Sequence, residues 1–201
     1  RQMCIRDRSG PSLESATADL WSLDLSQRGD DSFGWEAHES LPGPTRALHV
    51  AATAHNGNHD AIYVISGRRQ QGQEIEFLKD VWEYVPATAE WRQRSDAPRC
   101  VMAGPGIGFG RGRVLVLGGA DGSLFHLSDQ LRDDHPGFPK QALAYDTIAD
   151  TWTSAGPMPA NQVTTIAVPW NGAIVIPSGE VRPRVRSARV WRVEATGSLG
   201  D

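Results

Sequence analysis

Short stretches of alternating apolar and polar residues recur along the chain and predict β-strands. The alternation is clearest in Val81–Tyr84 and Ala142–Tyr145, where a period of two places apolar side chains on one face of a strand. Each stretch is followed by a polar turn and then by a tryptophan, Trp91 or Trp152. The pattern therefore predicts an all-β chain that repeats one arrangement of short strands.

A repeat of about 60 residues organises these strands. Trp35, Trp91 and Trp152 recur at this period, and a proline turn follows each tryptophan. Each complete repeat can hold four short strands. In the first complete repeat they are Ala47–Ala54, Ala61–Ser66, Asp80–Val85 and Trp91–Arg94, and in the second they are Val101–Phe109, Arg113–Leu117, Leu143–Asp146 and Thr151–Ser154.

A glycine follows the second strand of each repeat, at Gly67, Gly119 and Gly179. We expect the backbone there to pack closely or to take a positive φ. Four-stranded units with this glycine, and with an aromatic pair on the third and fourth strands, are typical of the blades of a kelch-type β-propeller. A β-sandwich is the alternative, but its strands do not recur in a fixed four-strand unit.

The predicted units are too few to close a ring, because a propeller has about four to eight blades. They are a partial blade at 10–41, complete blades at 42–97 and 98–158, a partial blade at 159–194, and a tail at 195–201. Residues 1–9 are set apart, since residues 2–8 resemble the translation of a sequencing adapter. We therefore expect a piece of a longer protein, with further blades and the signal-peptide region upstream.

Composition excludes several classes of protein. The 201 residues are 39% hydrophobic and 22% charged, as in an ordinary globular chain. A net charge of −4 and a pI near 5.9 give no basic excess for binding nucleic acid, and no apolar run approaches the roughly 20 residues of a membrane span. With residues 1–9 set apart, Cys100 has no disulfide partner, and the six histidines show no ligand spacing, so we expect no metal.

The candidate chemistry lies in residues 178–187, Ser-Gly-Glu-Val-Arg-Pro-Arg-Val-Arg-Ser. Predicted strands flank this segment, so it should turn a hairpin in which Glu180 and Arg186 face each other across Pro183. A charged turn of this kind is, by itself, most often a solvated loop.

This segment resembles the signature Gly-Glu-x-Lys-Pro-Gly-x-Arg-Thr of the N-acetylneuraminate epimerases, also called sialic acid mutarotases. Those proteins are six-bladed kelch propellers, so about three of six blades would be present here. The resemblance covers the predicted blades from about Ala18 to Glu194. It implies that Glu180 and Arg186 are the catalytic pair, and that the protein is periplasmic or secreted. Arg184 departs from the signature, since it occupies the place of the usual glycine.

Apart from the resemblance, a carboxylate next to a guanidinium group is suited to the interconversion of sugar anomers. That reaction takes a proton from the anomeric hydroxyl and delivers one to the ring oxygen, with no redox step and no cofactor. Glu180 can act as general base and acid, while Arg186 orients it, stabilises oxyanion charge or binds a substrate carboxylate. The alternative is that Arg186 only forms a surface ion pair with Glu180.

Three further arginines are candidates for binding an anionic sugar. Arg68 follows the glycine of its repeat as Glu180 does in the last one, so we expect both on the same rim. Arg46 and Arg99 precede first strands, nearer the axis. Each of the three can instead be a structural residue that donates to loop carbonyls. The long segment 120–140 is a candidate lid or wall.

The predicted function is that of a carbohydrate epimerase or mutarotase, an isomerase that interconverts anomers of N-acetylneuraminic acid or a related sugar acid. We expect the present chain to be inactive by itself. The alternative is a non-catalytic kelch propeller that binds a protein or glycan through the same loops. The first hypothesis implies a small-molecule sugar acid as partner, and the sequence does not indicate the oligomeric state.

Overall fold

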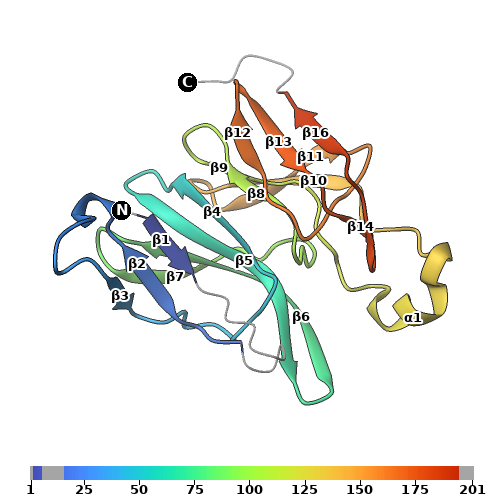
Figure 1. Cartoon of the computed structure of the whole chain (residues 1–201), viewed down its shortest axis with the longest axis horizontal. Helices are drawn as coiled ribbons and strands as arrows, with labels where there is room; N and C mark the ends of the chain where they lie inside the picture. Colours follow the sequence, from blue (N-terminus) through green and yellow to red (C-terminus); the bar gives the residue numbers. More distant parts are fainter. Residues whose placement is uncertain (1, 6–15, 195–201) are drawn as a thin grey trace.

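Separate antiparallel sheets contain most of the regular structure (Figure 1). The computed structural model describes residues 2–5 and 16–194. Its helical parts are one turn, α1 (Ser128–Leu131), and short 3₁₀ turns at Leu25–Gln27, Phe125–Leu127 and Arg132–Asp134. The first sheet contains β1 (Gln2–Ile5), β2 (Leu20–Leu23) and β3 (Trp35–His38).

Two four-stranded sheets follow, and in each of them the strands pair in sequence order. One contains β4 (Val50–His55), β5 (Asp60–Gln71), β6 (Glu74–Val85) and β7 (Glu90–Arg94). The next contains β8 (Gly106–Gly108), β9 (Arg113–Val116), β10 (Gln141–Asp146) and β11 (Thr151–Pro157). This repeated meander is the arrangement expected of propeller blades.

The last part of the described chain forms a sheet of three strands and a separate hairpin. The sheet contains β12 (Val168–Trp170), β13 (Ala173–Pro177) and β16 (Val190–Val193). The hairpin, β14 (Glu180–Arg182) and β15 (Val185–Arg186), lies between β13 and β16 in the sequence. The predicted all-β, propeller-type fold is confirmed, and among the described residues the sheets do not join into a closed ring.

Two features differ from the sequence prediction. Residues 2–5, which the sequence analysis set apart, form β1 and pair with β2 at one edge of the first sheet. β5 and β6 continue past their predicted ends, through a bulge between Ile65 and Gly67, into a long two-stranded ribbon that projects from the molecule in Figure 1. The alternation of side chains past the bulge is too weak to predict this ribbon, because residues 68–71 include no apolar residue and residues 69–77 are exposed or only half-buried. The tail 195–201 lies outside the described residues.

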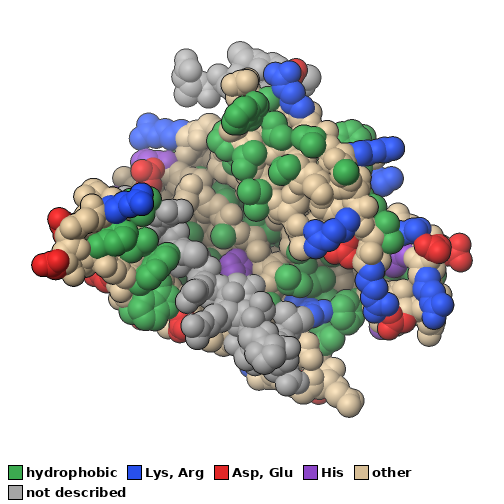
Figure 2. All heavy atoms as spheres, in the orientation of Figure 1, with side chains coloured by type: hydrophobic (Ala, Val, Ile, Leu, Met, Phe, Trp, Pro, Cys, Tyr) green, Lys and Arg blue, Asp and Glu red, His purple; other side chains and the backbone are tan. Residues whose placement is uncertain are grey.

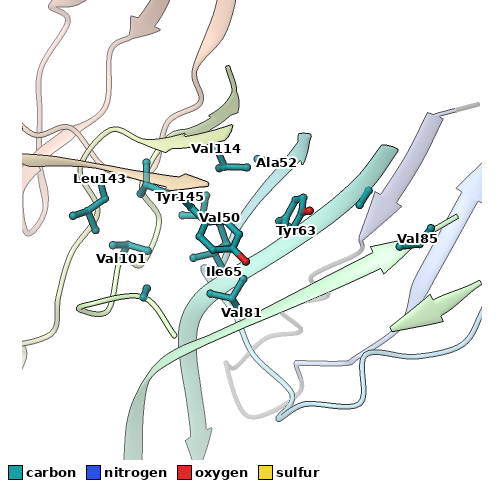
Figure 3. Packing of buried hydrophobic residues seen from close by; sticks show 13 residues of the cluster. Val50, Ala52, Tyr63, Ile65, Val81, Val85, Val101, Val114, Leu143 and Tyr145 are labelled. Atoms are coloured by element: carbon teal, nitrogen blue, oxygen red, sulfur yellow. The ribbon is translucent and has the colours of Figure 1, made fainter. Parts of the chain in front are cut away.

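The main hydrophobic core lies between the second and third sheets (Figure 3). Val50, Tyr63 and Val81 contribute from one sheet, and Val114 and Tyr145 from the next, all of them almost fully buried. The rings of Tyr63 and Tyr145 pack edge to face with centroids 5.8 Å apart. Full burial of such side chains contributes about 1.5–3 kcal/mol each, so this contact fixes the two sheets against each other.

A buried polar network joins the same two sheets. The Glu83 carboxylate, 0% exposed, accepts hydrogen bonds from Tyr63 Oη at 2.9 Å and Asn56 Nδ2 at 3.0 Å. Arg94 Nε donates to Tyr145 Oη at 3.2 Å and lies 3.7 Å from Glu83 Oε2. Burial, and next the hydrogen bond with Glu83, raise the pKa of Tyr63, so its hydroxyl remains a donor. The network satisfies the buried carboxylate and aligns the sheets.

The three repeated tryptophans lie at equivalent positions on the last strands of successive sheets, as predicted. Trp91 Nε1 donates to Glu39 O at 2.9 Å, and Trp152 Nε1 donates to Ser95 O at 3.0 Å. These bonds reach residues that follow the preceding repeat's tryptophan, so both side chains pack between neighbouring sheets. The Trp35 side chain, by contrast, is 54% exposed.

Replacing Trp91 with alanine should lower the free energy of unfolding by about 3 kcal/mol. The side chain is half-buried, packs on Tyr84 at a centroid distance of 5.0 Å, and covers Leu20 and Ile62. Urea denaturation followed by circular dichroism measures the effect, with the exposed Trp35→Ala variant as the matched control. A loss under about 1 kcal/mol for Trp91→Ala would contradict the packing role.

Candidate active site at the rim of the sheets

The residue after the repeated glycine occupies the same structural position in three sheets. Each such residue forms an antiparallel bridge with the loop that precedes the first strand of its sheet. The bridges are Ala47 with Arg68, Met102 with Ala120, and Val163 with Glu180. The predicted equivalence of Arg68 and Glu180 is thereby confirmed, and we call Arg68, Ala120 and Glu180 the rim positions.

Glycine is required immediately before the rim positions. Gly179 has φ +125°, and a Cβ there would lie 2.9 Å from Val163 O. Gly67 and Gly119 likewise have positive φ and close backbone neighbours. A side chain at any of these glycines would push the bridging loop away. The glycine therefore fixes the rim residue against the loop, as the sequence analysis expected.

A chain of backbone hydrogen bonds ties the three bridging loops together. Ala103 N donates to Leu48 O at 2.7 Å, and Thr164 N donates to Ala103 O at 2.8 Å. All three residues have left-handed φ values, between 52° and 61°. Left-handed conformations in residues other than glycine are uncommon and gather at functional sites. This chain of bonds holds side chains from three different sheets in fixed relation to one another.

The β14–β15 hairpin places Glu180 directly opposite Arg186 in register, which confirms that these residues face each other. Thr164 Oγ1 donates to Glu180 Oε2 at 3.3 Å, and Arg184 N donates to Glu180 Oε1. Glu180 is half-buried. Arg186 is exposed and forms no ion pair with any described residue, so the surface ion pair considered as an alternative is absent from this structure. The carboxylate is held by two neutral donors and remains open to solvent.

Arg184, at the place of the signature glycine, takes a left-handed conformation of the kind that glycine adopts most easily. Its φ of 65° is left-handed, which costs a residue with a side chain about 1 kcal/mol. The turn nevertheless directs the Arg184 N–H at the Glu180 carboxylate. The Arg184 side chain points to the long segment instead, where Nη2 lies 2.7 Å from Asp129 Oδ1. Arg184 therefore contributes to the site through its backbone N–H and ties the hairpin to the long segment through its side chain.

The long segment 120–140 lies against the hairpin, as a candidate wall should. Besides the contact through Arg184, Arg182 Nη2 lies 2.6 Å from Asp133 Oδ1. The aspartates of both pairs are largely exposed, so each pair contributes about 1 kcal/mol or less. A cavity of about 450 Å³ lies between the segment and the hairpin, with Phe125, Phe138 and Pro183 among its walls.

Arg68 is the one of the three predicted binding arginines whose donors remain available. Its side chain is 8% exposed, and its guanidinium lies 4.8 Å from the centre of the Phe125 ring. Nε is buried and has no partner, and the guanidinium makes no hydrogen bond or ion pair with a described residue. Burial lowers the pKa of Arg68. A buried arginine without an acceptor favours an anionic ligand.

Arg46 is occupied by structural contacts. Its guanidinium forms a two-point ion pair with Asp80, at 2.7 and 2.6 Å, and donates to Ser66 O and Pro44 O, both at 3.1 Å. It is 2% exposed. These contacts use its donors, so the geometry favours the structural alternative and Arg46 is left out of the proposed site.

Arg99 is also occupied by loop carbonyls. Nη1 donates to Cys100 O at 3.1 Å, and Nη2 donates to Gly118 O at 3.1 Å and Gln141 O at 3.0 Å. Burial lowers its pKa, although Asp121 opposes this effect. Like Arg46, Arg99 ties the loop before a first strand to the neighbouring strands, and the structural alternative is favoured again.

Thr164 is the site residue that the sequence analysis missed. It is a single threonine with no motif around it, and only its position one residue after the bridge partner of Glu180 identifies it. Within the described ranges, no group of three or more His, Cys, Asp or Glu side chains is placed to hold a metal ion. No helix in the same ranges is long and apolar enough to cross a membrane.

Curated proteins with sequences similar to this chain are named N-acetylneuraminate epimerase. A Yersinia enterocolitica protein named N-acetylneuraminate epimerase is 25% identical over 213 aligned positions, covering 92% of this chain and 52% of the relative. A Pasteurella multocida protein of the same name is 23% identical, with the same coverage of each chain. The chain thus spans about half the length of these curated relatives. No family model matches it.

The fold has a counterpart among solved structures. The structure of YjhT superposes with a TM-score of 0.71 at 22% sequence identity, covering 92% of this chain and 58% of that one. Identity at this level supports the fold alone. Together with the sequence comparison, it confirms the resemblance that the hairpin signature indicated: over nearly its whole length the chain is similar to the N-acetylneuraminate epimerases.

Proposed function

We propose that this chain is part of a mutarotase that interconverts the anomers of N-acetylneuraminic acid or a related sugar acid. The observation that carries the proposal is the register pairing of Glu180 with Arg186, with the Glu180 carboxylate held by Thr164 and by the backbone of Arg184. The names of the similar proteins support the reaction class. By the same resemblance we place the protein in the periplasm or outside the cell.

In this proposal Glu180 moves the proton. Its carboxylate takes the proton of the anomeric hydroxyl while the bond from the anomeric carbon to the ring oxygen breaks, and the resulting carboxylic acid then gives that proton to the ring oxygen. Rotation of the open-chain carbonyl and reversal of these steps give the other anomer. The donors from Thr164 and Arg184 fix the carboxylate, and lone pairs remain for the substrate.

The two cationic residues have separate roles. Arg186, opposite Glu180 and without an ion pair among the described residues, can stabilise the oxyanion that develops when the ring opens. Arg68, at the equivalent rim position of another sheet, can bind the carboxylate of the sugar acid through its unoccupied donors.

Saturation-transfer NMR of N-acetylneuraminate tests the proposal. The protein made from the whole gene should speed exchange between the α and β anomer signals above the spontaneous rate at the same pH. A propeller that only binds a glycan would broaden or shift those signals without changing the exchange rate. Unchanged exchange at saturating protein would therefore refute the mutarotase proposal and favour the binding alternative.

A further inference from the structure

A second cavity, of about 540 Å³, lies between the hairpin, the end of the long segment and β16, and basic side chains gather around it. Glu180 is not among its lining residues, and neither is any other Asp or Glu of the described chain. Its ionisable lining residues are His135, Lys140, Arg182, Arg186 and Arg189. Figure 2 shows basic side chains over the β14 hairpin and the neighbouring α1 segment.

Three of these cations have no counter-ion in the described structure. Lys140, Arg186 and Arg189 are exposed at the surface, and none of them forms an ion pair with a described residue. Arg182 is paired with Asp133, which lies outside the cavity and is 93% exposed. Scattered surface cations are ordinary, but several cations that converge on one concave site without an acid raise the local concentration of anions.

Two buried polar atoms of residues that line the cavity also lack partners. The indole Nε1 of Trp191 is a donor without an acceptor, and Oε1 of Gln162 is an acceptor without a donor. Gln162 is 3% exposed, and its Nε2 is already used by Ser178 O and Arg189 O. Buried polar atoms are normally paired, so these two unpaired atoms beside the cavity are exceptions, and a bound ligand that moves the lining side chains could reach them.

His135 can add a neutral donor. Its Nδ1 accepts a hydrogen bond from Gly137 N at 3.0 Å, so in the neutral ring the proton lies on Nε2. The side chain is 7% exposed and lines the cavity. The cavity therefore combines charged donors with neutral ones, which is the chemistry that binds a carboxylate, sulfate or phosphate group.

We propose that this cavity is a binding site for a small oxyanion, separate from the Glu180 carboxylate. Arg186 connects the two, because it borders the cavity and pairs in register with Glu180. A bound anion would hold the Arg186 guanidinium on the cavity side of the hairpin. This inference does not depend on the proposed catalytic activity, since it concerns binding alone.

The test is a titration with sulfate at constant ionic strength, with chloride as the balancing anion, on the protein made from the whole gene. The Trp191 indole N–H signal in ¹⁵N NMR, assigned with Trp191→Phe, is the reporter. We expect a saturable shift of this signal. Lys140→Gln and Arg189→Gln should each weaken sulfate binding about tenfold, because each removes a charge-assisted contact.

Arg192→Gln is the matched control. Arg192 lies on β16 near the cavity but pairs with Glu194 at 2.8 Å and does not line the cavity, so sulfate affinity should be unchanged. Thermal unfolding verifies that each variant is folded. A shift that does not saturate, or equal losses in Lys140→Gln, Arg189→Gln and Arg192→Gln, would overturn the proposal and leave only general charge screening.

A second titration identifies the source of the oxyanion. If N-acetylneuraminate displaces sulfate from the Trp191 signal, the cavity, and not Arg68, takes the carboxylate of the sugar acid. If both bind together, the cavity takes a separate inorganic or organic anion. Either result supports the oxyanion site. Loss of anomer exchange in the unmodified protein would refute the mutarotase proposal without affecting this titration.

Discussion

Replacing Glu180 with glutamine should slow protein-catalysed exchange between the sugar anomers by about 10²–10⁴-fold. Glutamine has the size of glutamate, and its amide can keep both local contacts. Its carbonyl can accept from Arg184 N, and its NH₂ group can donate to the Thr164 hydroxyl. The hairpin should therefore keep its shape, while the side chain can no longer take a proton from the sugar.

The rate is measured by saturation-transfer NMR, with circular dichroism and thermal unfolding to verify the fold. Glu76→Gln is the matched control, because Glu76 is exposed on the β5–β6 ribbon and only contacts Arg69 at 3.8 Å. Its exchange rate should equal that of the unmodified protein. If Glu180→Gln is equally active, Glu180 is not the proton carrier, and the hairpin is better interpreted as a binding surface.

The repeat could be predicted from the sequence because its landmarks are local. Alternating strands, a glycine after the second strand and a tryptophan on the last strand are each visible within a few residues. The same is true of the hairpin, where Pro183 and the flanking strands put Glu180 opposite Arg186. These features depend on residues that lie close together in the sequence, and the structure confirms them.

The roles of the arginines could not be predicted, because most of their partners are distant in the sequence. Arg46 pairs with Asp80, and Arg99 donates to the carbonyl of Gln141. No sequence feature near either arginine identifies these acceptors. Arg68, by contrast, packs against the face of the Phe125 ring and has no hydrogen-bond acceptor among the described residues. Whether an arginine is structural or available for a ligand depends on which acceptors the tertiary fold brings to it.

Replacing Arg46 with methionine should lower the free energy of unfolding by about 3–5 kcal/mol. Methionine fills part of the space but leaves the Asp80 carboxylate, whose side chain is only 15% exposed, without its cation. Asp80 would keep just the hydrogen bond from Trp82 Nε1 at 2.7 Å. Ser66 O, buried at the bulge in the middle of β5, would also lose its donor. A buried charge without its partner is the main cost.

Urea denaturation measures this loss as a lower midpoint at unchanged slope. The control is Arg69→Met, because Arg69 is 33% exposed and its partner Glu76 is 60% exposed at 3.8 Å, so the change should be under about 1 kcal/mol. Arg46→Lys should recover only part of the stability, since a point charge cannot make the two-point contact with Asp80. If Arg46→Met unfolds like the unmodified protein but binds N-acetylneuraminate more weakly, Arg46 is a ligand residue after all, and the contacts to Asp80 do not define its role.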